Sequence, residues 1–262
     1  MIKRRFLCVV AALFLLPSAR VDAQRYASDA KIDGFAGAVK SSYQVIYEAE
    51  VAAGSMTHGE VLERLQTEYN SKGLRRNMTY YTVSEGVIFR TRYKHDGFGL
   101  TTLEHIVDPE ENIIGRTYYV YDAHNTLTET YVEDAERQVE SRILIRYDSF
   151  GRVSQRSYND QFNEIYKREV YTYGPDGNVQ KTVVYDRDEN KVQEWRYEYD
   201  VHNQPVSQTL YDYTEQEPEV FFTLFKYTYD NRGNWIQKVE YELEGADMTP
   251  VYITERKISY FD

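Results

Sequence analysis

The residues of this chain that could do acid–base or metal chemistry are its histidines and carboxylates. The five histidines are His58, His95, His105, His124 and His202. No two of them have the His-x-x-x-His spacing that places two metal ligands on one element, and the sequence contains no Gly-x-Ser-x-Gly nucleophile elbow. We therefore predict no metal site, no cofactor, no catalytic residues and no enzyme activity.

Carboxylates are abundant, with 42 aspartate and glutamate residues, so a glycosidase-like pair has no specific signal among them. Five aspartates lie at or beside regularly spaced turns: Asp122, Asp148, Asp176, Asp200 and Asp230. A column of them could bind a divalent cation, but an aspartate in a turn also accepts hydrogen bonds from its own backbone. We favour turn capping and keep a carbohydrate-active hydrolase as an alternative function.

Aromatic side chains give the clearest indication of a ligand. Trp195, Tyr171, Tyr197 and Tyr227 could present flat faces to sugar rings while neighbouring polar groups bind the hydroxyls. Trp235 stands in the register that valines occupy in other units of the chain, so we expect it to pack between strands. Trp195 stands where the preceding unit has a glutamate, and we expect it to be the more exposed tryptophan.

A recurring pattern predicts the strands and turns that position these residues. In this pattern, a tyrosine is followed four residues later by a glycine or an asparagine. The pairs are Tyr69/Gly73, Tyr93/Gly97, Tyr121/Asn125, Tyr147/Gly151, Tyr173/Gly177, Tyr199/Asn203 and Tyr229/Gly233. Glycine and asparagine enter the left-handed backbone region at the least cost, so the pattern predicts turns with positive φ at these seven positions.

The tyrosines are spaced by 24, 28, 26, 26, 26 and 30 residues, and a partial copy follows at Tyr260. A period of this size is typical of stacked supersecondary units. Each unit has two runs rich in Tyr, Val, Ile and Thr, such as Val179–Tyr185 and Trp195–Tyr199, separated by a second turn. Connections this short make neighbouring strands antiparallel, and a ladder of tyrosines should cross the sheet.

The predicted fold class is therefore all-β: tandem β-hairpins in a long antiparallel meander. In Lys191–Tyr199 neither face is wholly apolar, and the mean hydropathy of the chain is −0.66. A packed sandwich needs one clean apolar face per strand. The mixed pattern favours a single curved or twisted sheet, and a closed or rolled barrel is the alternative.

Three segments divide the chain. Residues 1–23 have a basic start, an apolar run from Phe6 to Leu16 and small residues at a cleavage position, a pattern typical of a secretory signal peptide. Residues 24–68 form a leader and an atypical capping hairpin, and residues 69–262 form the repeat array. The only cysteine, Cys8, lies in the signal segment. We expect export to the periplasm, cell surface or medium, and no transmembrane segment in the mature chain.

The mature chain is acidic. Residues 1–23 carry four basic and one acidic residue, so their removal moves the net charge from −11 to −14. Lysine and arginine are scattered among the acids, and such a field repels nucleic acid. We therefore predict no nucleic-acid partner.

The turn segments carry a resemblance to a known family. Tyr147–Val153 (YDSFGRV), Tyr173–Val179 (YGPDGNV) and Tyr229–Trp235 (YDNRGNW) resemble the YD repeats of the RHS superfamily, over residues 69–262. With its leader Gly37–Ser41, the chain also resembles small exported proteins of Bacteroidetes-type bacteria. The resemblance implies a β-hairpin array at the cell surface or in the envelope, in contact with carbohydrate or protein.

Large RHS proteins differ from this chain, because they wind many more repeats into a shell around a toxin and carry a self-cleavage segment. We therefore do not expect toxin delivery here. The residues predict an exported, non-enzymatic binding or scaffold protein whose partner is an envelope or host polysaccharide. The alternative is a protein partner that pairs with the last strand, Val251–Phe261, which has no following unit to pair with and therefore forms a free sheet edge.

Overall fold

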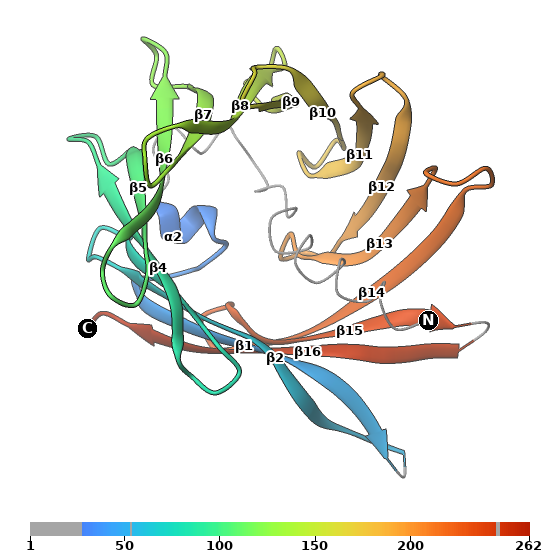
Figure 1. Cartoon of the computed structure of the whole chain (residues 1–262). Helices are drawn as coiled ribbons and strands as arrows, with labels where there is room; N and C mark the ends of the chain where they lie inside the picture. The colour runs from blue at the N-terminus through green and yellow to red at the C-terminus, as the bar shows by residue number, and fades with distance from the viewer. Residues whose placement is uncertain (1–27, 53, 245–246) are drawn as a thin grey trace.

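The computed structural model describes residues 28–52, 54–244 and 247–262, which form a closed barrel of antiparallel strands (Figure 1). The predicted signal peptide and Cys8 lie outside the described residues. The all-β meander is confirmed. It closes into a barrel, which was the alternative arrangement, and it does not remain an open curved sheet.

Among the described residues, sixteen strands follow one another around the barrel in chain order. Their bounds are β1 (Val39–Ala52), β2 (Ser55–Tyr69), β3 (Arg75–Tyr81), β4 (Val87–His95), β5 (Thr101–Val107), β6 (Ile113–Tyr121), β7 (Leu127–Asp134), β8 (Val139–Tyr147), β9 (Val153–Asp160), β10 (Ile165–Tyr173), β11 (Val179–Asp186), β12 (Lys191–Tyr199), β13 (Pro205–Asp212), β14 (Glu219–Tyr229), β15 (Trp235–Glu244) and β16 (Asp247–Tyr260).

The leader hairpin closes the ring. Strand β1 pairs with β2 on one side and with β16 on the other, in a register that runs from Val39 opposite Tyr260 to Glu48 opposite Tyr252. The prediction of a free C-terminal edge is therefore wrong, because β16 pairs with both β15 and β1. A closed barrel leaves no edge strand for a partner to extend.

The turns after the marker tyrosines share one geometry. At Asp122–Thr126, the N–H of Asn125 donates to the carbonyl of Asp122 at 3.0 Å, and Asp122 Oδ1 accepts from the N–H groups of His124 and Thr126. Asn125 has φ of 60°. Positive φ also occurs at Gly73, Gly151, Gly177, Asn203 and Gly233.

Gly97 is the exception among the seven predicted turn positions. The residue with positive φ in this turn is Gly99, at 88°, and Asp96 supplies the capping carboxylate. The position of the marker tyrosine is therefore taken by His95, the last residue of β4. With this correction the marker residues are spaced by 26 from Tyr69 through His95 to Tyr121.

The turns at the opposite rim have the same hydrogen bonds but less suitable residues at the left-handed position. Positive φ occurs there at Glu85, Glu111, Arg137, Asn163 and Glu189. Only asparagine among these is a residue that favours this region. These five turns and the turns after the marker residues thus share one turn type with different residues.

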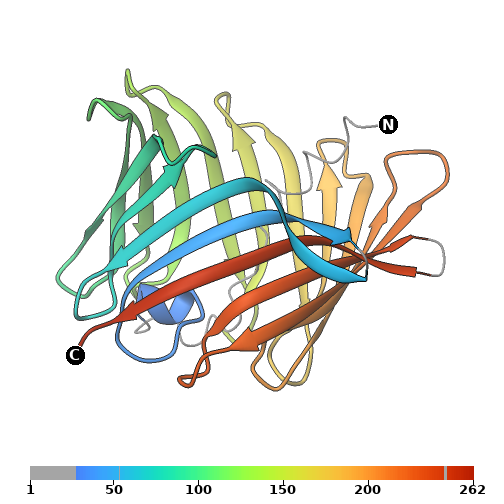
Figure 2. The same ribbon diagram turned by 90° about the horizontal axis from the view of Figure 1, so that it is seen from below.

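A short segment occupies the interior near one end of the barrel. Helix α2 (Asp29–Ile32) lies within the ring of strands in Figure 1, and Figure 2 places it close to the strand ends. A hydrophobic cluster of Ala30, Phe35, Val39 and Tyr69 joins this segment to the wall. This cluster is the apolar core of the molecule at that end.

The contacts of α2 identify the inner face of the wall. Tyr69, Arg75 and His95 all bond to side chains of Asp29 or Asp33, so they point inward. Side chains alternate between the two faces along a strand, and paired residues on neighbouring strands lie on the same face. The pairing registers therefore assign the inner and outer residues of each strand in turn. The predicted tyrosine ladder lies on this inner face.

The ladder tyrosines bond to the neighbouring hairpin. The hydroxyls of Tyr121, Tyr147, Tyr173 and Tyr199 donate to the carbonyls of Thr101, Leu127, Val153 and Val179, each 20 residues earlier, at 2.6–3.0 Å. Each ring is half-buried, and each hydroxyl satisfies a backbone acceptor at the start of a strand. The repeated tyrosine therefore joins one unit to the next.

Candidate functional site

The four aromatic residues predicted to bind a ligand all lie on the inner face. Tyr171 is opposite Thr182, Thr182 is opposite Trp195, and Trp195 is opposite Leu210, so they form one row across β10–β13. Tyr197 follows Trp195 on the same face of β12, and Tyr227 lies on the inner face of β14.

These aromatic side chains are half-buried parts of the wall. The hydroxyl of Tyr171 donates to Glu169 at 2.5 Å, and that of Tyr227 donates to the carbonyl of Pro205 at 2.9 Å. Burial raises the pKa of Tyr197 to about 12. Trp195 is half-buried, and its indole N–H is buried without an acceptor among the described residues. Their role in ligand binding stays a prediction.

Trp235 packs as expected. It is 9% exposed, and the guanidinium of Arg256 lies 3.3 Å from the centre of its ring. Arg256 also lies 5.1 Å from the ring of Phe35 and donates to Gln44 Oε1 at 3.0 Å. Burial lowers the pKa of Arg256 to about 10. This stack of two rings and a cation holds the α2 segment against the wall.

The most deeply buried charge of the inner wall is Glu169, which is 1% exposed. It accepts hydrogen bonds from Tyr158 at 2.8 Å and Tyr171 at 2.5 Å, and pairs with Lys167 at 3.0 Å. Burial raises the pKa of Glu169, but Lys167 and the two hydroxyls outweigh burial, and the pKa is lowered overall. Both oxygens of this carboxylate therefore have hydrogen-bond or ion-pair partners within the fold.

The α2 segment is held by further polar bonds. Asp29 Oδ2 contacts His95 Nε2 at 2.8 Å, Asp33 accepts from Tyr69 at 2.5 Å, and Arg75 Nε donates to Asp33 at 2.8 Å. At this end of the barrel, too, the inward-facing polar groups bond to other side chains of the protein.

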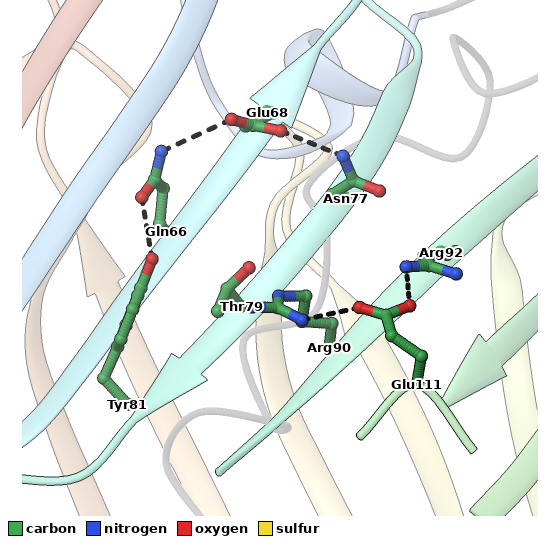
Figure 3. Close-up of a pocket in the computed structure, with 8 residues that line it drawn as sticks. All are labelled: Gln66, Glu68, Asn77, Thr79, Tyr81, Arg90, Arg92 and Glu111. Carbon is green, nitrogen blue, oxygen red and sulfur yellow. Dashed lines mark hydrogen bonds and ion pairs between the residues drawn. The ribbon is translucent and has the colours of Figure 1, made fainter. Parts of the chain in front are cut away.

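The outer face of β2–β6 has a different character. We call the hollow drawn in Figure 3 the outer groove; it has a volume of about 450 Å³. Its lining residues are Gln66, Glu68, Asn77, Thr79, Tyr81, Arg90, Arg92 and Glu111. The groove lies on the side of the wall opposite the ladder tyrosines, because these residues alternate with Thr67, Met78 and Tyr93.

Two carboxylates organise the outer groove (Figure 3). Glu68 accepts from Asn77 at 2.9 Å and from Gln66 at 3.5 Å, and the hydroxyl of Tyr81 donates to Gln66 at 2.9 Å. Glu111, in the turn before β6, pairs with Arg90 at 2.7 Å and also with Arg92. These bonds hold planar amide, carboxylate and guanidinium groups in fixed positions beside a tyrosine ring.

A second hollow, also of about 450 Å³, adjoins the outer groove and shares Asn77 and Arg92 with it. We call it the basic pocket. Its lining residues are Asn70, Arg75, Arg76, Asn77, Arg92, Tyr93, Lys94, His95 and His105. The two hollows adjoin across the strands from β2 to β5. The basic pocket also extends to the strand ends, where Arg75, Tyr93 and His95, whose side chains face inward, contribute to its lining.

The outer groove was missed from the sequence. The segment Arg90–Lys94 (RTRYK) places three cations on one face of a strand, and this alternation was the available signal. A solvated outer face gives the same alternation, so the segment alone did not distinguish a site. The groove becomes visible only when β2 and β3 bring Gln66 and Asn77 beside it.

Four of the five turn aspartates cap their turns, Asp122 as described above. Asp176 is the exception: Gly174 takes the capping position of that turn, and Asp176 accepts from the N–H of Asn178 at 3.1 Å. Asp148, Asp200 and Asp230 each accept backbone hydrogen bonds from the residues two and four positions later, at 2.8–2.9 Å. In the described part of the chain, no three His, Cys, Asp or Glu side chains lie where they could hold a metal ion. Across residues 28–52, 54–244 and 247–262, no helix has the length and apolarity needed to cross a membrane.

Comparison with known proteins gives a similarity of fold. No protein-family model and no curated protein matches the sequence. A porin-like protein from Bacteroides uniformis is similar in structure, with a TM-score of 0.56 at 10% identity, over 84% of this chain and 98% of that chain. At this identity the likeness concerns the fold alone.

Two further structures resemble the chain more weakly. A porin-like protein from Bacteroides vulgatus has a TM-score of 0.48 at 10% identity, over 87% of this chain and 99% of that chain. A chain of the TcdB2-TccC3-TEV structure has a TM-score of 0.28 at 13% identity, over 74% of this chain and 12% of that chain. Neither carries an argument here. The chain is an all-β barrel similar in fold to a porin-like protein of Bacteroides.

Proposed function

We propose that this chain is an exported, non-enzymatic binding protein of the bacterial envelope that holds a polysaccharide in the outer groove. The observation that carries this proposal is the groove itself, where fixed planar polar groups surround Tyr81 on a solvent-facing wall. Saccharide sites combine an aromatic surface with a few oriented hydrogen-bonding groups. Asn77, Thr79 and Gln66 supply such groups.

The inner face is less suited to this role. The ladder hydroxyls bond to backbone carbonyls, and Tyr171 and Tyr227 bond to Glu169 and Pro205. A ligand at these residues would compete with bonds that join the repeat units. Trp195 has an unused donor, as do the buried hydroxyls of Thr182 and Thr254, and of these three it alone offers an aromatic face. It is therefore the inner-wall position to test beside the outer groove.

Export is supported by the signal-peptide pattern of residues 1–23, and an envelope location by the fold shared with a porin-like protein. The charged residues on the outer face favour a barrel that is surrounded by water and not by lipid. Arg90, Arg92 and Lys94 succeed one another on the outer face of β4, and lysine or arginine facing lipid at mid-bilayer costs about 2–4 kcal/mol each. We expect the chain without residues 1–23 to purify without detergent; a requirement for detergent would contradict this part of the proposal.

We also propose that the turns belong to the YD-repeat type that they resemble. The support is structural: one hairpin unit of 26 residues recurs, with a capping aspartate and a left-handed glycine or asparagine. Superposition of Tyr147–Tyr173 on a solved YD-repeat hairpin tests this. The proposal fails if the tyrosine hydroxyl of that hairpin does not meet the carbonyl 20 residues before it.

The function is tested by measuring binding of residues 24–262 to a panel of immobilised envelope and host polysaccharides. The double variant Asn77→Ala, Thr79→Ala removes two groove side chains, and Thr172→Ala, Thr209→Ala is its match on the outer face of β10 and β13. We expect the groove variant to bind about thirtyfold more weakly, since two neutral hydrogen bonds contribute about 1 kcal/mol each, and the match to bind normally.

Two outcomes would overturn the proposed function. One is the absence of saturable binding to every polysaccharide of the panel. The other is a loss that is equal in the groove variant and in its match. Polysaccharide incubated with the protein should also keep its chain length, as measured by size-exclusion chromatography; shortened products would indicate the hydrolase alternative.

A further inference from the structure

The basic pocket is unusual for this protein because of its charge. The chain has 42 acidic and 31 basic residues. Among the described residues that line the pocket there is no carboxylate, while Arg75, Arg76, Arg92, Lys94, His95 and His105 all take part. A hollow lined by charge of one sign concentrates ions of the opposite sign.

The basic side chains of the pocket fall into two groups. Arg75 is held by Asp33, His95 by Asp29 and Arg92 by Glu111. Arg76 and Lys94 form no ion pair with any described residue, and both are exposed. The first group gives the pocket a fixed frame, and the second leaves two positive charges available to a ligand.

The pKa of His105 reflects the positive charge around it. It lies on the outer face of β5, opposite Arg92 on β4 and opposite Arg116 on β6. Burial, followed by Lys94, Arg116 and Arg92, lowers the pKa of His105. A lowered pKa favours the neutral imidazole, so the positive charge beside His105 is carried by Lys94, Arg92 and Arg116.

The basic pocket continues into the outer groove through Asn77 and Arg92. One end of this surface offers amides and hydroxyls, and the other offers unpaired cations. A chain molecule that lies across both ends needs hydroxyl groups for the first and an acid group for the second. Acidic polysaccharides have this composition.

We propose that the basic pocket binds the acid group of an acidic polysaccharide whose sugar hydroxyls lie in the outer groove. This inference rests on the proposed function and adds the class of its ligand. The acid group is an oxyanion, either the carboxylate of a uronic acid or a sulfate ester. Arginine donates two parallel hydrogen bonds to such groups, and lysine adds a point charge.

The experiment compares three soluble probes by calorimetric titration of residues 24–262. Dextran and dextran sulfate share a backbone and differ in charge, and polygalacturonate carries carboxylates. We expect dextran sulfate or polygalacturonate to bind more tightly than dextran, with an affinity that falls as salt is raised. The tighter of the two acidic probes identifies the acid group.

The variant that tests the pocket is Arg76→Gln, Lys94→Gln. Both side chains are exposed and make no ion pair with described residues, so the fold should be kept. Lys226→Gln, Lys257→Gln is the match, on the outer faces of β14 and β16. We expect the pocket variant to bind the acidic probe at least about tenfold more weakly, as hydrogen bonds to charged groups are strong, and the match to bind within about twofold.

The outcomes separate this inference from the function on which it rests. Equal binding of dextran and the acidic probes, unchanged in the pocket variant, would overturn the inference and leave polysaccharide binding in place. Equal losses in the pocket variant and its match would also overturn it, because they would indicate a non-specific effect of charge.

Failure of all three probes, together with failure of the polysaccharide panel, would overturn the proposed function. The pocket is then tested by titration with inorganic sulfate while NMR monitors the histidine ring signals. The variant His105→Gln assigns the His105 signal. A saturable shift of the His105 signal, lost in Arg76→Gln, Lys94→Gln, would keep an oxyanion site. No shift would overturn that site as well.

Discussion

The two faces of the barrel wall are both polar, but their polar groups are used differently. On the inner face, Glu169 bonds to Tyr158, Lys167 and Tyr171, and the ladder tyrosines bond to backbone carbonyls. In the basic pocket, the exposed cations Arg76 and Lys94 have no carboxylate partner among the described residues. Groups with buried partners support the fold, and groups without them are available to a ligand.

This difference gives a rule for reading a polar barrel wall, since residue type alone does not separate the two faces. Removing one member of a buried polar set leaves its partners unsatisfied, and removing a solvated charge does not. Inner-face substitutions should therefore lower stability, and substitutions in the basic pocket should lower binding. The predictions below test that division.

The largest effect on stability is expected for Glu169→Gln. The substitution removes the charge that accepts from two tyrosine hydroxyls and pairs with Lys167. Because Lys167 is itself 34% exposed, it is not left as a buried charge, and we expect a loss of about 2–3 kcal/mol, in the range of hydrogen bonds to charged groups. Urea unfolding should show a loss in that range. Glu198→Gln is the outer-face match, exposed on β12, and should change the free energy of unfolding by less than about 0.5 kcal/mol. Similar losses in both variants would break the comparison.

The same carboxylate gives a pH dependence. The folded pKa of Glu169 is lowered, so its ionised form stabilises the fold above the unfolded pKa of about 4.3, and that contribution is lost as pH falls through the folded pKa. The stability gap between wild type and Glu169→Gln should be full at neutral pH and shrink below about pH 4. Urea titrations over this range measure the gap; a gap that widens on acidification would contradict the assignment.

A smaller loss is expected for Trp195→Ala. Trp195 is half-buried and lies in a row with Tyr171, Thr182 and Leu210, so truncation opens a space in the inner wall. Full burial would give a loss of about 3–5 kcal/mol, and half-burial should give about 2 kcal/mol. Polysaccharide affinity should not change if the outer groove holds the ligand. Weaker binding with unchanged stability would instead place the ligand on the inner face.

Much of the fold followed from the sequence because the turn is a local structure. The left-handed position and its capping aspartate depend on residues within five positions, as at Asp122–Thr126. The assignment failed at Gly97 because the alignment was tied to tyrosine. His95 holds the marker position there and bonds to Asp29, so the true turn begins two residues later.

Closure of the barrel could not be predicted from the repeat. It depends on the pairing of β1 with β16, and β1 lies outside the periodic region. A meander of similar strands closes or stays open according to its accumulated twist and stagger, which no single unit contains. The candidate site was missed for a related reason, because Gln66 and Arg90 come from strands separated in sequence and meet only in the sheet.

A still smaller effect should separate two tyrosine hydroxyls. Tyr147 donates to the Leu127 carbonyl at 2.6 Å on the inner face, while Tyr211 lies on the outer face of β13 with Arg196 stacked on its ring. Tyr147→Phe leaves a carbonyl without its donor and should cost about 1 kcal/mol. Tyr211→Phe should cost less than about 0.5 kcal/mol. Thermal unfolding of the two variants side by side measures this difference, and equal costs would remove the structural role given to the ladder.

The smallest effect on stability is expected in the basic pocket itself. Arg76→Gln, Lys94→Gln removes two exposed charges that pair with no described carboxylate, and Lys94 lies among the cations that lower the pKa of His105. Surface substitutions of this kind stay within about 0.5 kcal/mol, and relief of repulsion favours the stabilising sign. Urea unfolding without ligand should show no loss. A loss above about 1 kcal/mol would mean that these side chains support the fold as Glu169 does, and the division between the two faces would then fail where the proposed site depends on it.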